Sequence, residues 1–275
     1  LKRSKVSIEE GVRQNLDNQK SEFIQRFFTT MQFVMAGNDT EGLRYGTIET
    51  PEKYYLAWKE ESEKEFDYLM DKQLSLLCDK ERFLTIIHDF TVFDLSNKKL
   101  SRPNQYFGIT AAQKHVKDRA GGILWHTQGS GKSIMMIMLA KWIRENVTDS
   151  RVLIITDRDE LDKQIEGKFI DNEEKIYRTK SGKDLLEKLN AKEHWLLCSL
   201  IHKFGRQAEP TDEDFDKYIE EKFRVGRTRS CFRVELCREP GFGFVTDTFV
   251  CAVVHVDEQG FPVGTQRIVI NREPM

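Results

Sequence analysis

The chain has 275 residues, of which 39% are hydrophobic and 32% charged, proportions that are typical of a globular protein with a buried core. Lys and Arg number 43 against 45 Asp and Glu, so the net charge of -2 gives no general affinity for nucleic acid, and any DNA-binding surface must be local. The five cysteines form no Cys-x-x-Cys pair, which argues against a zinc site or a disulfide framework, and the lack of a membrane-length apolar run or a signal-type segment leads us to expect a cytoplasmic protein with no membrane partner.

The first hundred residues predict a hairpin followed by helices. Two β-like runs, residues 30–36 and 43–48, flank a stretch of turn-forming residues and so predict a hairpin with a loop. Residues 51–100 are predicted to be helical, most clearly over residues 80–94, where apolar side chains recur at steps of three and four: Phe83, Ile86, Ile87, Phe90 and Phe93. Residues 101–104, which include Pro103, break this pattern and form the best candidate for a domain boundary.

From Gly121 onward, short apolar strands alternate with helices. Strands are predicted at residues 122–126, 152–156 and 195–200, and helices at residues 134–143, at residues 159–169 and after the capping-box pair Ser181 and Asp184. Continuous apolar strands that alternate with helices predict an α/β fold with a parallel sheet. After about Glu221 the helical periodicity is lost, and the sequence predicts a β-rich or irregular tail.

The strongest chemical signal is the run Trp-His-Thr-Gln-Gly-Ser-Gly-Lys-Ser at residues 125–133, which follows a predicted strand and opens a predicted helix. Glycines allow backbone N–H groups to turn inward around phosphate oxygens, and the start of a helix adds further donors. Lys132 is expected to contact the β- and γ-phosphates of ATP, and Ser133 to be a ligand of Mg²⁺. His126 stands where the usual pattern has its first glycine, a departure that helicase-like proteins share. A chance Gly-Ser linker is the alternative, but linkers do not join a buried strand to an apolar helix.

Three further segments give weaker signals. Gln105 lies upstream of this loop, and its amide has the donor and the acceptor needed to read adenine, although a plain surface glutamine is the alternative. Residues 157–164 and 199–204 each follow a predicted strand, at the sheet edge where ligand sites lie in α/β folds. Their candidate contacts to DNA phosphates, for which an ordinary loop remains the alternative, are Arg158, Lys163, Ser199 and Lys203.

Together these segments resemble the restriction (R) subunit of type I restriction-modification enzymes, which carries a superfamily 2 helicase-like motor. The resemblance rests on residues 43–58, 104–107, 125–133, 153–164 and 198–205. It implies a nuclease domain followed by RecA-like motor domains, with ATP and Mg²⁺ as cofactors. It also implies double-stranded DNA and the methylation and specificity subunits as partners. The residues that it implies for nucleotide binding are Gln105 for adenine, and Gly129, Ser130, Gly131, Lys132 and Ser133 for the triphosphate and its metal.

The two ends of the sequence match this family less well. Leu1 and Lys2 resemble the end of the family's Glu-Leu-Lys nuclease motif, which would make Lys2 a catalytic lysine, and Gln14 resembles a glutamine that follows it. Without the family, Lys2 would be no more than a terminal lysine. Near the other end, Asp257 and Glu258 follow an apolar run, as in a motif that closes a Mg²⁺ site, but residues 259–261 do not continue the motif. We therefore expect a structural or foreign tail rather than a working site.

We expect a fragment of such a subunit in four parts: the end of a nuclease domain at residues 1–58, a helical connector at 59–100, a partial first RecA-like ATP-binding motor domain at 101–221 and an atypical tail at 222–275. The parent enzyme would couple ATP hydrolysis to DNA translocation and endonucleolytic cleavage, while the fragment would lack turnover. One alternative is a non-catalytic remnant that binds only subunits or DNA. Another is a different P-loop enzyme, such as a DNA helicase or a kinase.

Overall fold

A computed structural model of the chain describes residues 6–200, apart from 119–121, 127–128, 149, 157–158 and 192, and then Lys203 and three strands at 231–237, 249–255 and 265–266. The chain divides into two compact units, Leu1–Phe107 and Gly108–Met275, and the division falls inside a helix shortly after the predicted break at residues 101–104. Within the described part of the chain, none of the helices combines the length and the apolar character that a membrane crossing requires.

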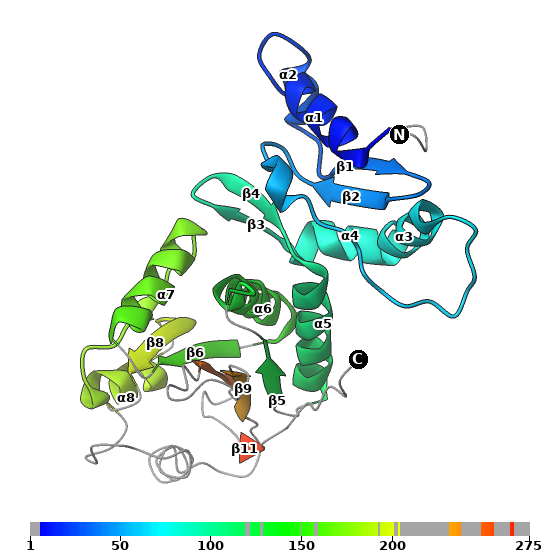
Figure 1. Cartoon of the computed structure of the whole chain (residues 1–275). Helices are drawn as coiled ribbons and strands as arrows, with labels where there is room; N and C mark the ends of the chain where they lie inside the picture. The colour runs from blue at the N-terminus through cyan, green and yellow to red at the C-terminus, as the bar shows by residue number, and fades with distance from the viewer. Residues whose placement is uncertain are drawn as a thin grey trace, which may run out of the picture. The chain divides into compact units, whose positions relative to one another are not determined.

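The first unit opens with two helices and a hairpin (Figure 1). Its elements, in order, are α1 (Ile8–Asn18), α2 (Gln25–Phe28), β1 (Val34–Asn38), β2 (Gly42–Gly46), the 3-10 helix η1 (Glu52–Tyr54), α3 (Leu69–Leu77), α4 (Lys80–Asp89), β3 (Thr91–Asp94) and β4 (Asn97–Leu100). Strands β1 and β2 pair antiparallel from Val34 with Gly46 to Asn38 with Gly42, so the predicted hairpin is confirmed. Helix α1 was not predicted, although Ser7, whose hydroxyl accepts from the backbone N–H of Glu9, is a recognisable N-cap.

The helix predicted over residues 80–94 is wrong beyond Asp89. Helix α4 ends there, and β3 and β4 form a second antiparallel hairpin across the two-residue turn Leu95-Ser96. Both turn residues have positive φ angles, 50° and 68°, as the tight turns of hairpins require. Phe93 therefore lies on a strand and is 52% exposed, instead of facing the core from a helix. The expected helical connector is thus part helix and part hairpin.

The core of the first unit surrounds Trp58, which is almost completely buried. The Trp58 ring lies 5.3 Å from the ring of Tyr106, and the guanidinium of Arg82 lies over it at 5.3 Å. Gln73 connects this cluster to the first hairpin, because its side chain accepts from the backbone N–H of Leu43 at 2.6 Å and donates to the carbonyl of Trp58 at 3.0 Å. The segment 43–58 is therefore central to the packing of this unit.

The second unit has an α/β fold, with a β-sheet and several helices (Figure 1). Helix α5 (Pro103–Lys117) leads into it, followed by β5 (Gly122–Trp125), α6 (Lys132–Asn146), β6 (Ser150–Thr156), α7 (Asp159–Asp171), β7 (Tyr177–Arg178), α8 (Gly182–Asn190), β8 (Leu196–Leu200), β9 (Cys231–Cys237), β10 (Phe249–His255) and β11 (Thr265–Gln266). Strands β6, β8 and β7 are parallel neighbours, so the predicted parallel sheet is confirmed. Helix α8 begins after its predicted cap, since the Ser181 hydroxyl accepts from the backbone N–H of Asp184.

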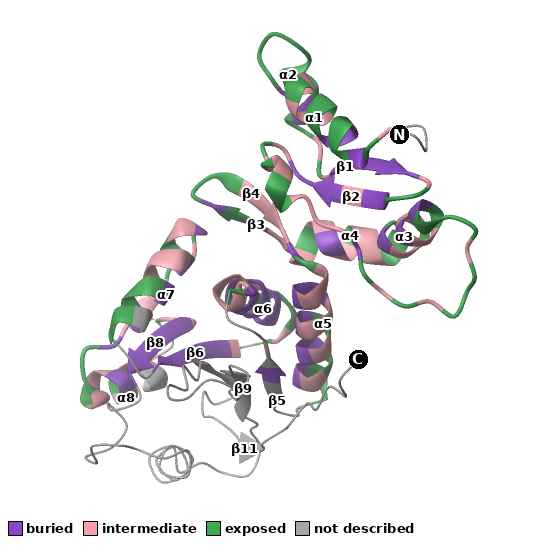
Figure 2. Cartoon of the chain, in the orientation of Figure 1, coloured by how far each residue is buried: buried purple, intermediate pink, exposed green. Residues whose placement is uncertain are grey.

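The order of the described strands is β11-β9-β10-β6-β8-β7, and β5 pairs with β9. Strand β5 is parallel to β9, whereas β10 is antiparallel to both β9 and β6. Strands β5, β6, β7 and β8 therefore share one direction, and their carboxyl ends lie at the same edge of the sheet. The interior of the unit is apolar: β6 from Arg151 onward, all of β8 and most of α6 are buried (Figure 2). This burial explains why the sequence of these strands is apolar without alternation.

Candidate nucleotide-binding site

The junction between β5 and α6 has the backbone geometry of a phosphate loop. Strand β5 ends at Trp125, and α6 begins at Lys132 with Gly131 as its N-cap residue. The φ angles of Gly129 and Gly131 are 78° and 82°, in the left-handed region where a side chain would strain the backbone. Both glycines are thus needed for the turn. Two other residues of the run, Thr127 and Gln128, lie outside the described residues.

The space and charge around this loop suit a phosphate group. Gly129 is exposed, and a Cβ atom built on it would meet no atom of the described residues within 4 Å, its chain neighbours apart. The Nζ atom of Lys132 donates to the carbonyl of His126 at 3.2 Å, which holds the ammonium group across the loop. The first turn of α6 is formed, because the carbonyl of Gly131 accepts from the backbone N–H groups of Ile134 and Met135. A helix N-terminus with a lysine beside it is a favourable environment for a polyphosphate, so the residues present fit ATP.

Gln105 has a structural contact that the sequence pattern did not predict. It lies in the first turn of α5 and is only 3% exposed. Its side-chain oxygen accepts from the backbone N–H of Arg102 at 2.8 Å. This is one half of a capping box, which satisfies a donor at the helix start. The proposed reading of adenine by this residue stays a prediction.

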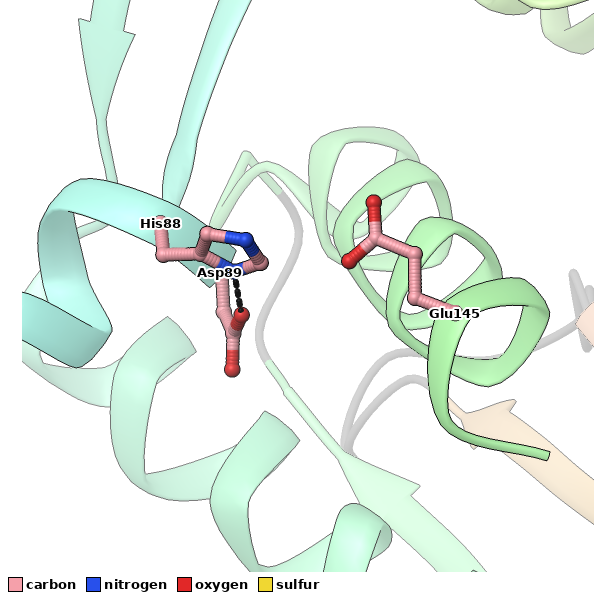
Figure 3. A group of neighbouring side chains, drawn as sticks. All are labelled: His88, Asp89 and Glu145. Carbon is pink, nitrogen blue, oxygen red and sulfur yellow. Dashed lines mark hydrogen bonds and ion pairs between the residues drawn. The ribbon is translucent and has the colours of Figure 1, made fainter.

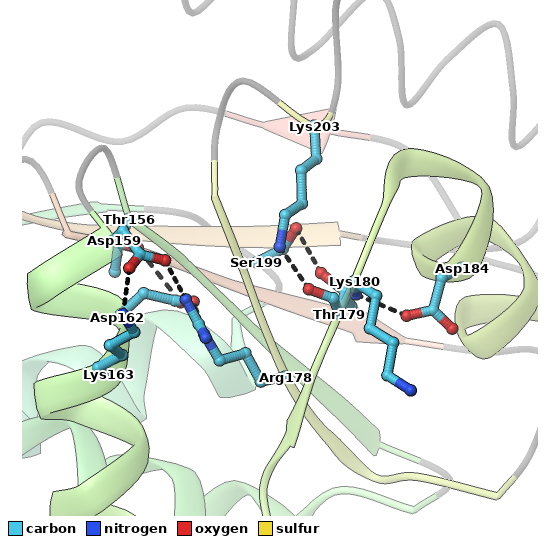
Figure 4. Close-up of polar contacts among 10 residues, drawn as sticks. All are labelled: Thr156, Asp159, Asp162, Lys163, Arg178, Thr179, Lys180, Asp184, Ser199 and Lys203. Carbon is cyan, nitrogen blue, oxygen red and sulfur yellow. Dashed lines mark hydrogen bonds and ion pairs between the residues drawn. The ribbon is translucent and has the colours of Figure 1, made fainter.

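The segment that follows β6 is held by a network of ion pairs (Figure 4). Asp162 on α7 is completely buried, accepts from the hydroxyl of Thr156 at 3.3 Å, and pairs with the guanidinium of Arg178 on β7. Arg178 also pairs with Asp159, which is bound by Lys163 at 2.7 Å. The bond from Lys163, assisted by Arg178, holds the pKa of the Asp159 carboxyl below its usual value, and the bond to Asp162 raises the pKa of Arg178. Lys163 is therefore engaged within the protein, and the other DNA-contact candidate of this segment, Arg158, lies outside the described residues.

The expectation that Ser199 contacts a DNA phosphate is not supported by its position. Its side chain is fully buried in β8, and its hydroxyl accepts from the hydroxyl of Thr179 at 2.8 Å (Figure 4). Lys203 donates to the backbone carbonyl of Thr179. Ser199 on β8 and Lys203 beyond it therefore both contact Thr179, the residue after β7. Their place could not be read from the local sequence, because Thr179 is twenty residues away from Ser199 along the chain.

Lys2 and Gln14, two further candidates from the sequence, belong to the first unit, whereas Asp257 and Glu258 lie outside the described residues. Lys2 is outside the described residues, and Gln14 is exposed on α1. At the end of α4, Nδ1 of His88 lies 2.6 Å from a carboxylate oxygen of Asp89 (Figure 3). The two residues are adjacent in the chain and the His88 side chain is mostly exposed, so the contact is a local one. This pair has an ordinary structural explanation.

Comparisons with known proteins find similarity over the region that contains the β5–α6 junction. The family described as SWI2/SNF2 ATPase matches residues 104–230. The type I restriction enzyme HindI endonuclease subunit of Haemophilus influenzae is 29% identical over 164 residues, which cover 52% of this chain and 15% of that protein. The SsaAORF53P endonuclease subunit of Staphylococcus saprophyticus is 22% identical over 250 residues, covering 88% of this chain and 26% of that protein. The C-terminal part of a putative MpnIIP endonuclease subunit of Mycoplasma pneumoniae is 27% identical, covering 59% of this chain and 87% of that protein.

The chain thus spans only a small part of the length of the first two relatives, 15% and 26%. The chain thus matches both restriction endonuclease subunits and an ATPase family. The ATPase match includes the whole junction from β5 to α6. The chain is therefore similar in sequence to parts of the endonuclease subunits of type I restriction enzymes, and it carries a region similar to SWI2/SNF2 ATPases.

Proposed function

We propose that this chain is the nucleotide-binding part of a type I restriction R subunit and that it binds ATP with Mg²⁺ at residues 129–133. The observation that carries the proposal is the pair of left-handed glycines, Gly129 and Gly131, directly before Lys132 at a strand-to-helix junction. In this role Lys132 leaves the carbonyl of His126 and binds the β- and γ-phosphates, while Ser130 lies within the loop and the Ser133 hydroxyl binds Mg²⁺. Adenine recognition by Gln105 belongs to the same proposal. Hydrolysis of the bound ATP would supply the energy for movement on DNA.

The wider function is proposed at the level of the whole subunit. It comprises ATP-driven translocation along double-stranded DNA and endonucleolytic cleavage, in a cytoplasmic complex with the methylation and specificity subunits. The names of the relatives and the ATPase match support this proposal. The four-part division and a nuclease role for Lys2 rest on the sequence resemblance alone. We further propose, from the sequence resemblance, that these 275 residues bind ATP with little turnover.

Nucleotide binding is tested by thermal unfolding of the whole chain with and without Mg²⁺ and ATP. ATP at 100 times its Kd should stabilise the native state by about 2.7 kcal/mol. Lys132→Ala should abolish this stabilisation. Lys141→Ala is the matched control, because Lys141 lies on the same helix but pairs with Glu174. The proposed site would be refuted if ATP stabilised Lys132→Ala as much as the control, or if ATP did not stabilise the unmodified chain. Either result would favour a non-catalytic remnant. Sustained DNA-stimulated hydrolysis that requires Lys132 would contradict low turnover.

A further inference from the structure

We propose that His126 is a positioning residue of the phosphate loop and that Gly108 on α5 provides the space in which its imidazole ring is held. The inference rests on the proposed function of this loop and adds a residue to it. A Cβ atom built on Gly108 would lie 2.8 Å from Nε2 of His126 and 3.1 Å from Cε of Met135. Both approaches are closer than an alanine could allow without movement of a neighbour.

Gly108 has no conformational reason to be glycine. It lies inside a fifteen-residue helix, and its φ angle is not among the positive values that glycine tolerates. Glycine weakens the interior of a helix relative to alanine, so its presence there calls for a packing reason. The close approach of the His126 ring and Met135 supplies that reason. The three residues join α5, the start of the loop and the first turns of α6.

His126 also contacts the loop through its backbone. Its carbonyl accepts from Nζ of Lys132, so the residue whose ring rests on Gly108 also holds the lysine of the loop. The usual phosphate-loop pattern has a glycine at the position of His126, and a glycine there would have no side chain that could fix the first residue of the loop. Met135, on the other side of the loop, is almost completely buried and bonded to the carbonyl of Gly131. The contact of His126 with Gly108 therefore fixes the beginning of the loop relative to its end.

The proposal predicts that extra volume at residue 108 disturbs nucleotide binding through His126. Gly108→Ala should displace the ring and weaken the binding of a fluorescent ATP analogue with Mg²⁺ by about tenfold. His126→Ala should weaken it less, because it removes the anchor without adding a clash. The double variant, Gly108→Ala with His126→Ala, should bind the analogue no more weakly than His126→Ala alone, because it has no imidazole ring to displace. Gly167→Ala is the matched control: this glycine is also helical, on α7, and a Cβ there meets no atom within 4 Å.

Hydrogen exchange without nucleotide gives an independent measurement. Gly108→Ala should accelerate exchange of the Ile134 and Met135 amides, which donate to Gly131, while Gly167→Ala should not. Unchanged exchange and unchanged affinity in Gly108→Ala would overturn the proposal, and so would a double variant whose losses simply add. If the unmodified chain does not bind the analogue, the proposed function fails, and the exchange data alone then decide whether His126 positions the loop.

Discussion

The ion pair between Arg178 and Asp162 should be a major local contribution to the stability of the second unit. The Asp162 side chain has no exposed surface, whereas that of Arg178 is 25% exposed. Arg178→Met keeps an unbranched chain but removes the positive charge, so the buried carboxylate is left with neutral partners such as the hydroxyl of Thr156 and the thiol of Cys198. Loss of one partner of a buried pair costs about 3–5 kcal/mol, and the partial exposure of Arg178 leads us to expect about 3 kcal/mol.

Urea unfolding followed by far-ultraviolet circular dichroism measures this loss. Lys163→Met is the control, because the side chains of Lys163 and Asp159 are 63% and 50% exposed, and exposed pairs contribute little. A double variant, Arg178→Met with Asp162→Leu, should regain most of the lost stability, since no buried charge then remains without its partner. The reasoning is refuted if Arg178→Met is no less stable than Lys163→Met, or if the double variant is less stable than Arg178→Met.

Two further predictions concern a turn and a helix cap. Gly42→Ala should destabilise the first unit by about 2 kcal/mol in urea unfolding, because residue 42 has a φ of 83° and a Cβ there would clash with Oε1 of Gln73. A Gly42→Ala variant as stable as Gly167→Ala would contradict this. The backbone N–H of Lys180, assisted by the hydroxyl of Tyr177, lowers the pKa of the Asp184 carboxyl in the folded chain. The stabilisation from this carboxylate is therefore complete above its ordinary pKa of about 3.9, and it is lost as the pH falls through the lower folded-state pKa. The difference in urea midpoint between Asp184→Asn and the unmodified chain should therefore shrink in strong acid, and a difference independent of pH would be evidence against it.

The features that the sequence predicted well depend on neighbouring residues. The run from β5 into α6 combines an apolar strand, two glycines and a helix, and all of these signals lie within about two dozen residues. The cap of α8 and the first hairpin are also local. Their physical causes, a side chain bonded to a nearby N–H and a turn between two pairing strands, can be read from the residues involved.

The features that the sequence did not predict depend on contacts made at a distance or on competing patterns. Phe90 and Phe93 continued the helical spacing of α4, yet the positive φ angles at Leu95 and Ser96 close a hairpin instead. The place of Ser199 depends on Thr179, and Gly108 acquires its role only through His126. Helical spacing at the end of a helix is therefore a weak guide, and contacts between side chains need the fold.

The direction of β10 bears on what the tail can contribute to a Mg²⁺ site. In its pairing with β6, Val250 lies opposite Ile155 and His255 lies opposite Ser150, the first residue of β6. Strand β10 therefore ends at the edge where β6 begins, whereas the phosphate loop follows β5 at the edge where β6 ends. Ligand sites in α/β sheets lie at the carboxyl ends of the parallel strands, which is this second edge. Asp257 and Glu258 lie outside the described residues, but the strand before them runs in the opposite direction to the one such a motif requires. The direction of β10 and the sequence departure at residues 259–261 thus agree with the expectation of a structural or foreign tail.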